Sequence, residues 1–193
     1  NRCVESVVEN MDRFDNYNAC QRLNDFVDGL SNWYVRRSRD RFWSKDKTSQ
    51  DKYDAYWTLY ECLATTCKMI APFTPFVADA MWKNLTDGLQ GKALVSVHLC
   101  DYPTSRADQV DSGLSSRMEV LREIASLGRS ARMDAKLKVR QPLAGVEVIL
   151  GESAHQEWLE ANDAILKEEL NVKEIEFTQD ADHYITYQVQ PNF

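Results

Sequence analysis

The sequence predicts a mainly α protein, in which an antiparallel helix bundle is followed by a small α/β unit. Apolar residues recur every three or four positions through much of residues 1–134, as they do in helices with one buried face. Short polar segments separate these stretches, and short connections favour antiparallel neighbours. Further along, apolar residues alternate with polar ones, as in strands. We therefore expect a helical bundle over 1–134, with an extended linker at about 94–112, and an α/β unit over 135–193.

The first part of the chain is expected to form four helices. Asp15, Asn16 and Asn18 are turn and cap residues that separate the first helix from the second. Pro72 and Pro75 end the third helix, because proline cannot continue it, and Pro75 suits the first turn of a fourth. The expected ranges are about 3–13, 18–41, 50–70 and 75–88.

The second and third helices are expected to bury aromatic faces in the bundle. Both faces follow from the helical spacing of large apolar residues. In the second helix the face comprises Leu23, Phe26, Val27, Leu30, Trp33 and Tyr34. In the third helix it comprises Tyr53, Tyr56, Trp57, Tyr60, Leu63, Cys67 and Ile70.

The second half of the chain shows one more helix and then a change of pattern. A fifth helix is expected over about 113–134, and Gly128 inside it costs about 1 kcal/mol relative to alanine. A close approach of another helix would offset this cost, so we expect this helix to dock on the bundle. The α/β unit is expected to run strand, helix, strand, strand, at about 145–150, 152–170, 172–177 and 183–191.

The composition is that of a soluble, globular and acidic chain. Its 193 residues are 44% hydrophobic and 27% charged, with a formal net charge of -7. No segment approaches the roughly 20 apolar residues that a membrane-spanning helix needs. The chain begins with Asn1 and shows no apolar leader. We therefore expect a cytoplasmic protein with no membrane partner, of which this chain is an excised part.

The cysteines and histidines predict no metal site. The chain has five cysteines, and an odd number scattered through apolar stripes is typical of reduced thiols in the cytosol. Cys62 and Cys67 are five residues apart on one expected helix, so they point in different directions. His98, His155 and His183 have no partners at ligand spacing.

Positive charge is gathered in two segments despite the acidic total. Residues 36–47 contain six basic and two acidic residues, and residues 117–140 contain seven basic and three acidic ones. Residues 147–182 contain eleven acidic and two basic residues. Because the charges are segregated, a basic surface can coexist with a negative total.

The first basic segment ends the second helix, and two interpretations of it remain open. At 100° per residue, Arg37 and Arg41 fall on the apolar stripe that passes through Leu30. They could close the end of the bundle through ion pairs, and cations there also suit the helix dipole. The acids that could serve are Asp40, Asp46 and Asp54. Alternatively, the segment is a platform on which arginines meet phosphates and aromatic rings stack on unpaired bases.

The second basic segment also allows two interpretations. Arg129 and Arg132 are three residues apart and are neighbours on one helix face. Lys136, Lys138 and Arg140 alternate in what is expected to be an extended run, so all three should point the same way. A solvated face explains this pattern, and a ridge that tracks phosphates explains it equally.

The sequence contains no recognisable catalytic constellation. It has no glycine-rich phosphate loop, no nucleophile elbow and no pair of histidine and carboxylate at motif spacing. Paired acids such as Glu168 and Glu169 belong to a helix that is rich in acidic surface residues. We therefore expect no catalytic residue in this chain.

Four blocks of the sequence resemble, in this order, the C-terminal part of isoleucyl-tRNA synthetases. The blocks are LNDFVDGLSNWYVRRSRDRFW, MIAPFTPFVADAMWKNL, SVHLCDYP and SLGRSARMDAKLKVRQPL. They cover most of residues 1–150, and their matching order and separations make the resemblance specific. Residues 151–193 are similar more loosely.

The resemblance implies the anticodon-binding domain of a class I synthetase, which would position tRNA(Ile) for ATP-dependent aminoacylation. The family's HIGH and KMSKS signatures do not occur here, so the catalytic domain, with its ATP and Mg²⁺, would precede Asn1. The implied partners are the anticodon stem and loop of tRNA(Ile) and the synthetase's own catalytic and C-terminal domains. The first candidate RNA contacts are Arg36, Arg39, Arg41, Trp43, Lys45 and Lys47. Further candidates, to which the resemblance gives no role, are Arg132, Lys136, Lys138 and Arg140.

Two other functions remain open. A fragment of a valyl- or leucyl-tRNA synthetase would share the bundle and the APFTP turn, although NWYVRRSRDRFW and ARMDAKLKVRQPL favour isoleucine. A helical scaffold that binds proteins through its aromatic seam would need an exposed patch of Trp and Tyr. Whether Trp33, Trp57 and Tyr60 are buried distinguishes the scaffold from the synthetase domain.

Overall fold

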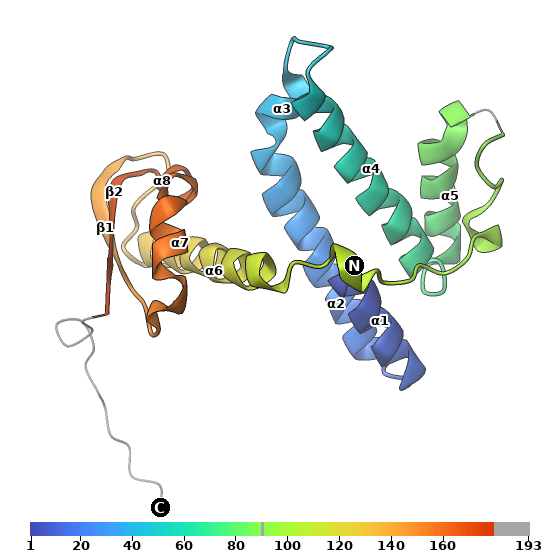
Figure 1. Ribbon diagram of the computed structural model, residues 1–193, viewed down its shortest axis with the longest axis horizontal. Helices are drawn as coiled ribbons and strands as arrows, with labels where there is room; N and C mark the ends of the chain where they lie inside the picture. Colours follow the sequence, from blue (N-terminus) through green and yellow to red (C-terminus); the bar gives the residue numbers. More distant parts are fainter. Residues whose placement is uncertain (90, 180–193) are drawn as a thin grey trace, which may run out of the picture. The chain divides into compact units, whose positions relative to one another are not determined.

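The protein is described by a computed structural model that covers residues 1–89 and 91–179. The chain forms two compact units, of which the first is Asn1–Val110 and the second begins at Asp111. The first unit is helical, and the second combines helices with a two-stranded sheet, as Figure 1 shows. The predicted fold class is confirmed. The domain boundary expected after residue 134 stays a prediction.

The first unit contains the four expected helices, one of them interrupted. Its α-helices are α1 (Arg2–Asp12), α2 (Asn16–Asp28), α3 (Arg39–Trp43), α4 (Gln50–Ile70) and α5 (Pro75–Thr86). A π-helical segment, Gly29–Val35, continues α2 towards α3. Short 3-10 turns follow at Asp87–Leu89, Val97–Leu99 and Ala107–Gln109. Asp15 caps α2 by accepting the Asn18 N–H at 3.0 Å, and Pro75 begins α5.

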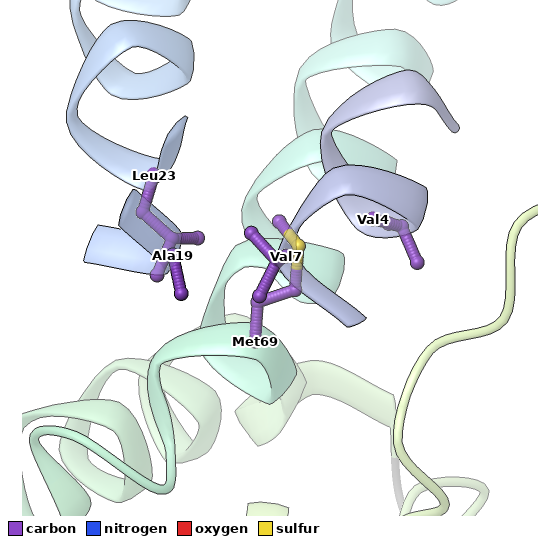
Figure 2. Packing of buried hydrophobic residues seen from close by; sticks show 5 residues of the cluster. All are labelled: Val4, Val7, Ala19, Leu23 and Met69. Carbon is purple, nitrogen blue, oxygen red and sulfur yellow. The ribbon is translucent and has the colours of Figure 1, made fainter. Parts of the chain in front are cut away.

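One hydrophobic cluster fastens α1 and α2 to the C-terminal end of α4. Its side chains converge from the three helices in Figure 2: Val4, Val7, Ala19, Leu23 and Met69. Val7 is completely buried, and Met69 is 1% exposed. A second cluster joins α4 to α5 and comprises Cys67, Ala78, Trp82 and Val97. The Trp82 indole N–H also donates to the Leu94 carbonyl at 2.8 Å, which holds the following loop against α5.

The aromatic face of α4 is not buried as the sequence predicted. Trp57 is 60% exposed and Tyr53 51% exposed, while the residues that α4 buries are Ala55, Thr66, Cys67 and Met69. Both hydrophobic clusters lie at the C-terminal half of α4, and its N-terminal half packs mainly against α3. Trp33 and Tyr60 are half-buried. The helical period was correct, but it could not show how far along α4 the neighbouring helices reach.

The second unit is a strand–helix–strand arrangement packed on a long helix. Its elements are α6 (Ser112–Asp134), β1 (Leu143–Ile149), a 3-10 turn (Ser153–His155), α7 (Gln156–Ala161), α8 (Asp163–Leu170) and β2 (Val172–Thr178). The strands pair in parallel, with Leu143 opposite Val172. The helix expected between them is divided at Asn162, whose side-chain amide donates to the Trp158 carbonyl at 2.8 Å and so competes with the backbone. The strand expected at 183–191 lies outside the described residues.

Leucines from α6, α7 and α8 form the interior of the second unit. Leu121, Leu159 and Leu166 are completely buried. The close approach expected at Gly128 occurs, and its neighbour is Leu170 of α8: a Cβ atom at Gly128 would lie 2.6 Å from the Leu170 Cδ2. Helix α6 therefore packs on the helices of its own unit, where the sequence had suggested the bundle.

No helix in the part of the chain that the structure describes is long and apolar enough to cross a membrane. Within the same residues, no group of three or more His, Cys, Asp and Glu side chains is placed to hold a metal ion. The five cysteines are free thiols.

Asp79 on α5 holds the loop that follows the helix, and this contact should depend on pH. Its Oδ1 accepts from Ser96 Oγ at 2.5 Å and from the Val97 N–H at 3.2 Å, and its Oδ2 pairs with Lys83 at 2.7 Å. The Lys83 and Ser96 hydrogen bonds, in that order, lower the pKa of Asp79 from 3.8 to about 2.

We therefore expect the loop to loosen in acid. Because the folded pKa is the lower one, the stabilisation is complete above pH 3.8 and is lost as the pH falls through about 2. Hydrogen exchange at the Val97 amide should accelerate in this window, relative to its intrinsic rate. The Asp79→Asn variant should lack the step, and an identical profile in both proteins would contradict the assignment.

Candidate nucleic-acid interface

The π-helical segment Gly29–Val35 determines which side chains are exposed at the end of the second helix. A π-helical turn holds more residues than the α-helical turn that it replaces. Residues beyond Gly29–Val35 are therefore displaced by one position, and Ser38 and Phe42 are buried where a continuous α-helix would bury Arg37 and Arg41. The prediction that the two arginines lie on the apolar stripe is wrong for this reason.

Arg41 closes the turn between α3 and α4 through Asp51. Its Nε lies 2.9 Å from both Oδ1 and Oδ2 of Asp51, and its Nη2 donates to the Asp51 carbonyl at 3.1 Å. These hydrogen bonds raise the pKa of Arg41 above its ordinary value. An ion pair was one of the two expected roles, but Asp51 was not among the predicted partners. The structure thus gives Arg41 an internal partner, and RNA contact by Arg41 stays a prediction.

The loop at residues 44–49 is ordered by hydrogen bonds of its own. Asp46 Oδ1 accepts from the Thr48 N–H at 2.8 Å and from its hydroxyl at 2.7 Å, and the hydroxyl bond is the main cause of a lowered pKa at Asp46. Lys52 donates to the Ser44 carbonyl at 2.7 Å. Asp46, one of the three predicted acids, is thus used inside the loop, and the loop is shaped before any ligand binds.

Helix α3 is fastened to α4 by aromatic contacts. The rings of Phe42 and Tyr56 are 5.0 Å apart, and the Tyr34 hydroxyl donates to the Ala55 carbonyl at 3.0 Å. Phe42 is buried, so one face of α3 is committed to the protein. Arg39 and Trp43, which point away from this buried side of the short helix, are exposed.

Four side chains at this end of the helical hairpin form an exposed basic and aromatic group. The Arg39 guanidinium lies 4.6 Å from the centre of the Trp43 ring, and Trp43 is 71% exposed. Lys45 and Lys47 are exposed, and among the residues that the structure describes neither has a side-chain partner. We call this group the basic tip: Arg39, Trp43, Lys45 and Lys47. It lies where α3 leads into α4 in Figure 1.

Arg36 and Arg37 lie next to the basic tip but are held differently. The Arg36 Nε donates to the Asn32 carbonyl at 2.9 Å, and Arg36 remains exposed. The Arg37 guanidinium lies 5.6 Å from the centre of the Trp33 ring. RNA contact by Arg36 stays a prediction.

In the second unit, Arg132 is buried rather than presented to a ligand. It is 5% exposed, and its Nη1 donates to the carbonyls of Lys138 and Gln141, each at 3.1 Å. Its Nη2 donates to the Asn171 carbonyl at 3.1 Å. Direct contact with RNA, which the sequence suggested for Arg132, is excluded by these positions.

Lys136, Lys138 and Arg140 are exposed, but they do not form the extended run that was expected. The Leu137 N–H donates to the Arg132 carbonyl at 2.8 Å and the Lys136 N–H to the Met133 carbonyl at 2.9 Å. This pair of bonds is the Schellman motif that ends helices, with Lys136 at its left-handed position (φ 56°). A second turn follows, with the Gln141 N–H on the Lys138 carbonyl. We call residues 136–140 the basic turn.

Both surfaces have the chemistry that binds RNA. Exposed lysine and arginine side chains neutralise phosphates, and an exposed indole ring offers a face to an unpaired base. Asp51 and Asn171 were missed by the sequence interpretation although they shape these surfaces. Asn171 has a left-handed φ of 50° at the end of α8 and donates to the Val139 carbonyl at 2.9 Å. An asparagine directly after a helical pattern was the available signal for it.

Comparisons with known proteins agree with this chemistry. Residues 1–150 match the family model described as the anticodon-binding domain of tRNA ligase. An isoleucine–tRNA ligase of Clostridium novyi is 42% identical over 192 residues, which is 100% of this chain and 18% of that protein. One of Dehalococcoides mccartyi is 46% identical over 173 residues, which is 90% of this chain and 17% of that protein.

A third relative comes from another bacterial group and covers a similar part of its protein. An isoleucine–tRNA ligase of Chlamydia trachomatis is 40% identical over 190 residues, which is 98% of this chain and 18% of that protein. The chain thus spans less than a fifth of the length of the curated relatives it matches.

Proposed function

The chain belongs to the family of anticodon-binding domains of tRNA ligases, and from this premise we propose that it binds the anticodon stem and loop of tRNA(Ile). The relatives that match nearly all of it are isoleucine–tRNA ligases. The domain would hold the tRNA while a catalytic domain outside this chain joins isoleucine to it. ATP and Mg²⁺ would act in that catalytic domain, as the resemblance implies, and the whole ligase would work in the cytoplasm.

The basic tip is the observation that carries this proposal. The Arg39 guanidinium lies over the exposed Trp43 ring, and the exposed Lys45 and Lys47 follow within four residues, on a chain whose net charge is -7. The nearby acids Asp46 and Asp51 are used in internal hydrogen bonds, so they compete little for the cations of the tip. The loop is ordered without a ligand, so less conformational entropy is lost when RNA binds. Phosphates would meet Arg39, Lys45 and Lys47, and an unpaired base would stack on Trp43.

The basic turn is proposed as a further contact with the same tRNA. Lys136, Lys138 and Arg140 are exposed on a turn whose backbone is fixed by hydrogen bonds. Such a turn suits phosphates of a stem better than bases, because it presents cations and no aromatic ring. Since the two surfaces belong to different units, each is proposed separately.

Binding of purified tRNAs tests the function. We expect the chain to bind a tRNA(Ile) transcript weakly, more tightly than tRNA(Val) or tRNA(Leu), with affinity that falls steeply as salt rises. A tRNA(Ile) transcript that lacks its anticodon arm should lose most of the affinity. Filter binding of the four transcripts gives the comparison. Preference for tRNA(Val) or tRNA(Leu) would assign the chain to another ligase, and equal binding of all four would contradict anticodon recognition.

The exposed face of α4 supports a second role for this domain within the parent ligase. Tyr53, Tyr56 and Trp57 are each about half exposed or more, which is unusual for aromatic residues at helical spacing. We propose that this face packs against another domain of the same ligase, which would cover it in the full-length protein. An independent protein-binding scaffold, the remaining alternative, would leave the face accessible in the full-length ligase, and solvent labelling of Trp57 there distinguishes the two.

A further inference from the structure

Arg132 is a buried cation that no carboxylate neutralises. Its three hydrogen bonds all go to main-chain carbonyls, and within the described residues it has no acidic partner. The neighbouring arginine of α6 is different, because Arg129 pairs with the buried Glu169 at 2.8 Å. Burying a guanidinium without a counter-charge is costly, so this placement calls for a specific reason.

Of the three carbonyls, one lies within the basic turn, one directly follows it and one lies beside it. Lys138 is inside the turn, Gln141 directly follows it, and Asn171 stands between α8 and β2. Asn171 in turn donates to the Val139 carbonyl, and the Leu143 N–H donates to the Asn171 carbonyl at 3.1 Å. One planar guanidinium therefore joins the turn to the start of the sheet. A lysine could not replace it, because an ammonium lacks the fixed fork of donors.

We propose that Arg132 is a positioning residue, which fixes the basic turn in the shape in which Lys138 and Arg140 contact phosphate. This inference rests on the proposed function of the turn. Without the guanidinium, the Lys138, Gln141 and Asn171 carbonyls would lose a donor, and the turn would open to find water. The two cations would then have to be ordered by the RNA itself, at a cost in affinity.

The left-handed Lys136 supports the same reading of the turn. Glycine is the usual residue at this position of a Schellman motif, because a side chain there is strained. The chain keeps a lysine at φ 56°, within four residues of two further cations. Together with the buried Arg132, these side chains place four positive charges at the end of α6. Positive charges there interact favourably with the negative end of the helix dipole.

A double-mutant cycle on the 193-residue chain tests the inference. The variants are Arg132→Lys, the pair Lys138→Ala with Arg140→Ala, and all three changes together. We expect Arg132→Lys and the alanine pair each to weaken binding of a tRNA(Ile) transcript about tenfold, the size of two lost phosphate contacts. In the triple variant, Arg132→Lys should cause no further loss. Equal losses on both backgrounds would overturn the positioning role.

Trypsin provides a readout that does not need RNA. Cleavage after Lys138 and Arg140 should be faster in Arg132→Lys, because the turn opens more often. The matched control is Arg129→Lys, which makes the same change one turn earlier and disturbs the contact with Glu169 instead. The control should leave cleavage and tRNA affinity unchanged. Equal acceleration in both variants would mean general destabilisation of the unit and would overturn the inference.

A second variant covers the case in which Arg132→Lys fails to fold. Asn171→Gly keeps the left-handed backbone at φ 50° and removes only the donor to Val139. It should give the same accelerated cleavage and the same absence of further loss on the alanine pair; independent losses would contradict the proposal. If the alanine pair alone binds tRNA as well as the unchanged chain, then the turn is not an RNA surface, and the proposed function of the turn fails before the positioning role is reached.

Discussion

Reversing three charges of the basic tip is expected to abolish most of the chain's affinity for tRNA. The variant carries Arg39→Glu, Lys45→Glu and Lys47→Glu. Each lost phosphate contact lowers the slope of log K against log salt by about 0.7 to 0.9, so three should lower it by about 2 to 3. The glutamates also repel the RNA directly, so at low salt the affinity should fall by about a hundredfold or more.

The fold should survive this change, because none of the three side chains is buried. Arg41 and Asp51, which close the turn, are unchanged in the variant. Circular dichroism and urea unfolding should therefore match those of the unchanged chain. A suitable control reverses three other exposed cations of the same unit, with Arg13→Glu, Lys92→Glu and Arg106→Glu.

The control separates a local contact from the effect of net charge. Both triple variants change the net charge equally, so non-specific attraction changes equally in the two proteins. Only the tip variant should change the salt slope by two units or more, as filter binding at several salt concentrations would measure. If the two slopes fall together, the tip is not where the tRNA binds.

Much of the fold could be predicted because local chemistry sets the ends of the helices. Asp15 caps α2 and Asp111 caps α6, each through a side-chain oxygen on a free N–H. Pro75 begins α5, and the alternating segments after Pro142 form the two strands. These signals act within four residues of the chain, so they are visible without tertiary structure.

The direction of side chains could not be predicted where local geometry departs from the ideal helix. A wheel of 100° per residue placed Arg37 and Arg41 inside, and the π-helical segment Gly29–Val35 put Ser38 and Phe42 there instead. No residue of that segment predicts a π-helix from the sequence, because the packing of the neighbouring helices determines whether the π-helical turn forms. The prediction that α4 buries its aromatic face was wrong for a related reason, because helical spacing does not show where a neighbouring helix ends.

The residues of the candidate site could be named from the sequence, but the role of each residue could be named only in part. Arg39, Trp43, Lys45 and Lys47 are exposed, as a contact surface requires. Arg41 and Arg132 have internal partners that are distant in sequence, Asp51 and the carbonyl of Asn171. An arginine that binds carbonyls leaves no complementary charge in the sequence. Long-range hydrogen bonds to the main chain are therefore the class of contact that sequence reasoning finds hardest.

The largest effect on stability is expected from Val7→Asp in the cluster of Figure 2. Val7 is completely buried among Val4, Ala19, Leu23 and Met69. None of these four side chains has a hydrogen-bond donor for a carboxylate. An unpaired carboxylate there costs about 4 kcal/mol or more. The total stability of a domain is about 5–15 kcal/mol, so most of the first unit's margin would be lost.

Loss of this cluster should affect the basic tip, although the cluster lies at the C-terminal end of α4 and the tip lies beyond its N-terminal end. The cluster joins α2 to α4 through Met69, and at the other end Arg41 and Asp51 close the turn. When the cluster opens, α2 and α4 lose the contacts that join them at this end of the hairpin, so tRNA binding should fall as the unit unfolds. Val27→Asp makes the same chemical change at an exposed site and should shift stability by no more than about 0.5 kcal/mol. Urea unfolding followed by circular dichroism compares the two, and equal midpoints would show that α1 lies outside the cooperative unit that supports the tip.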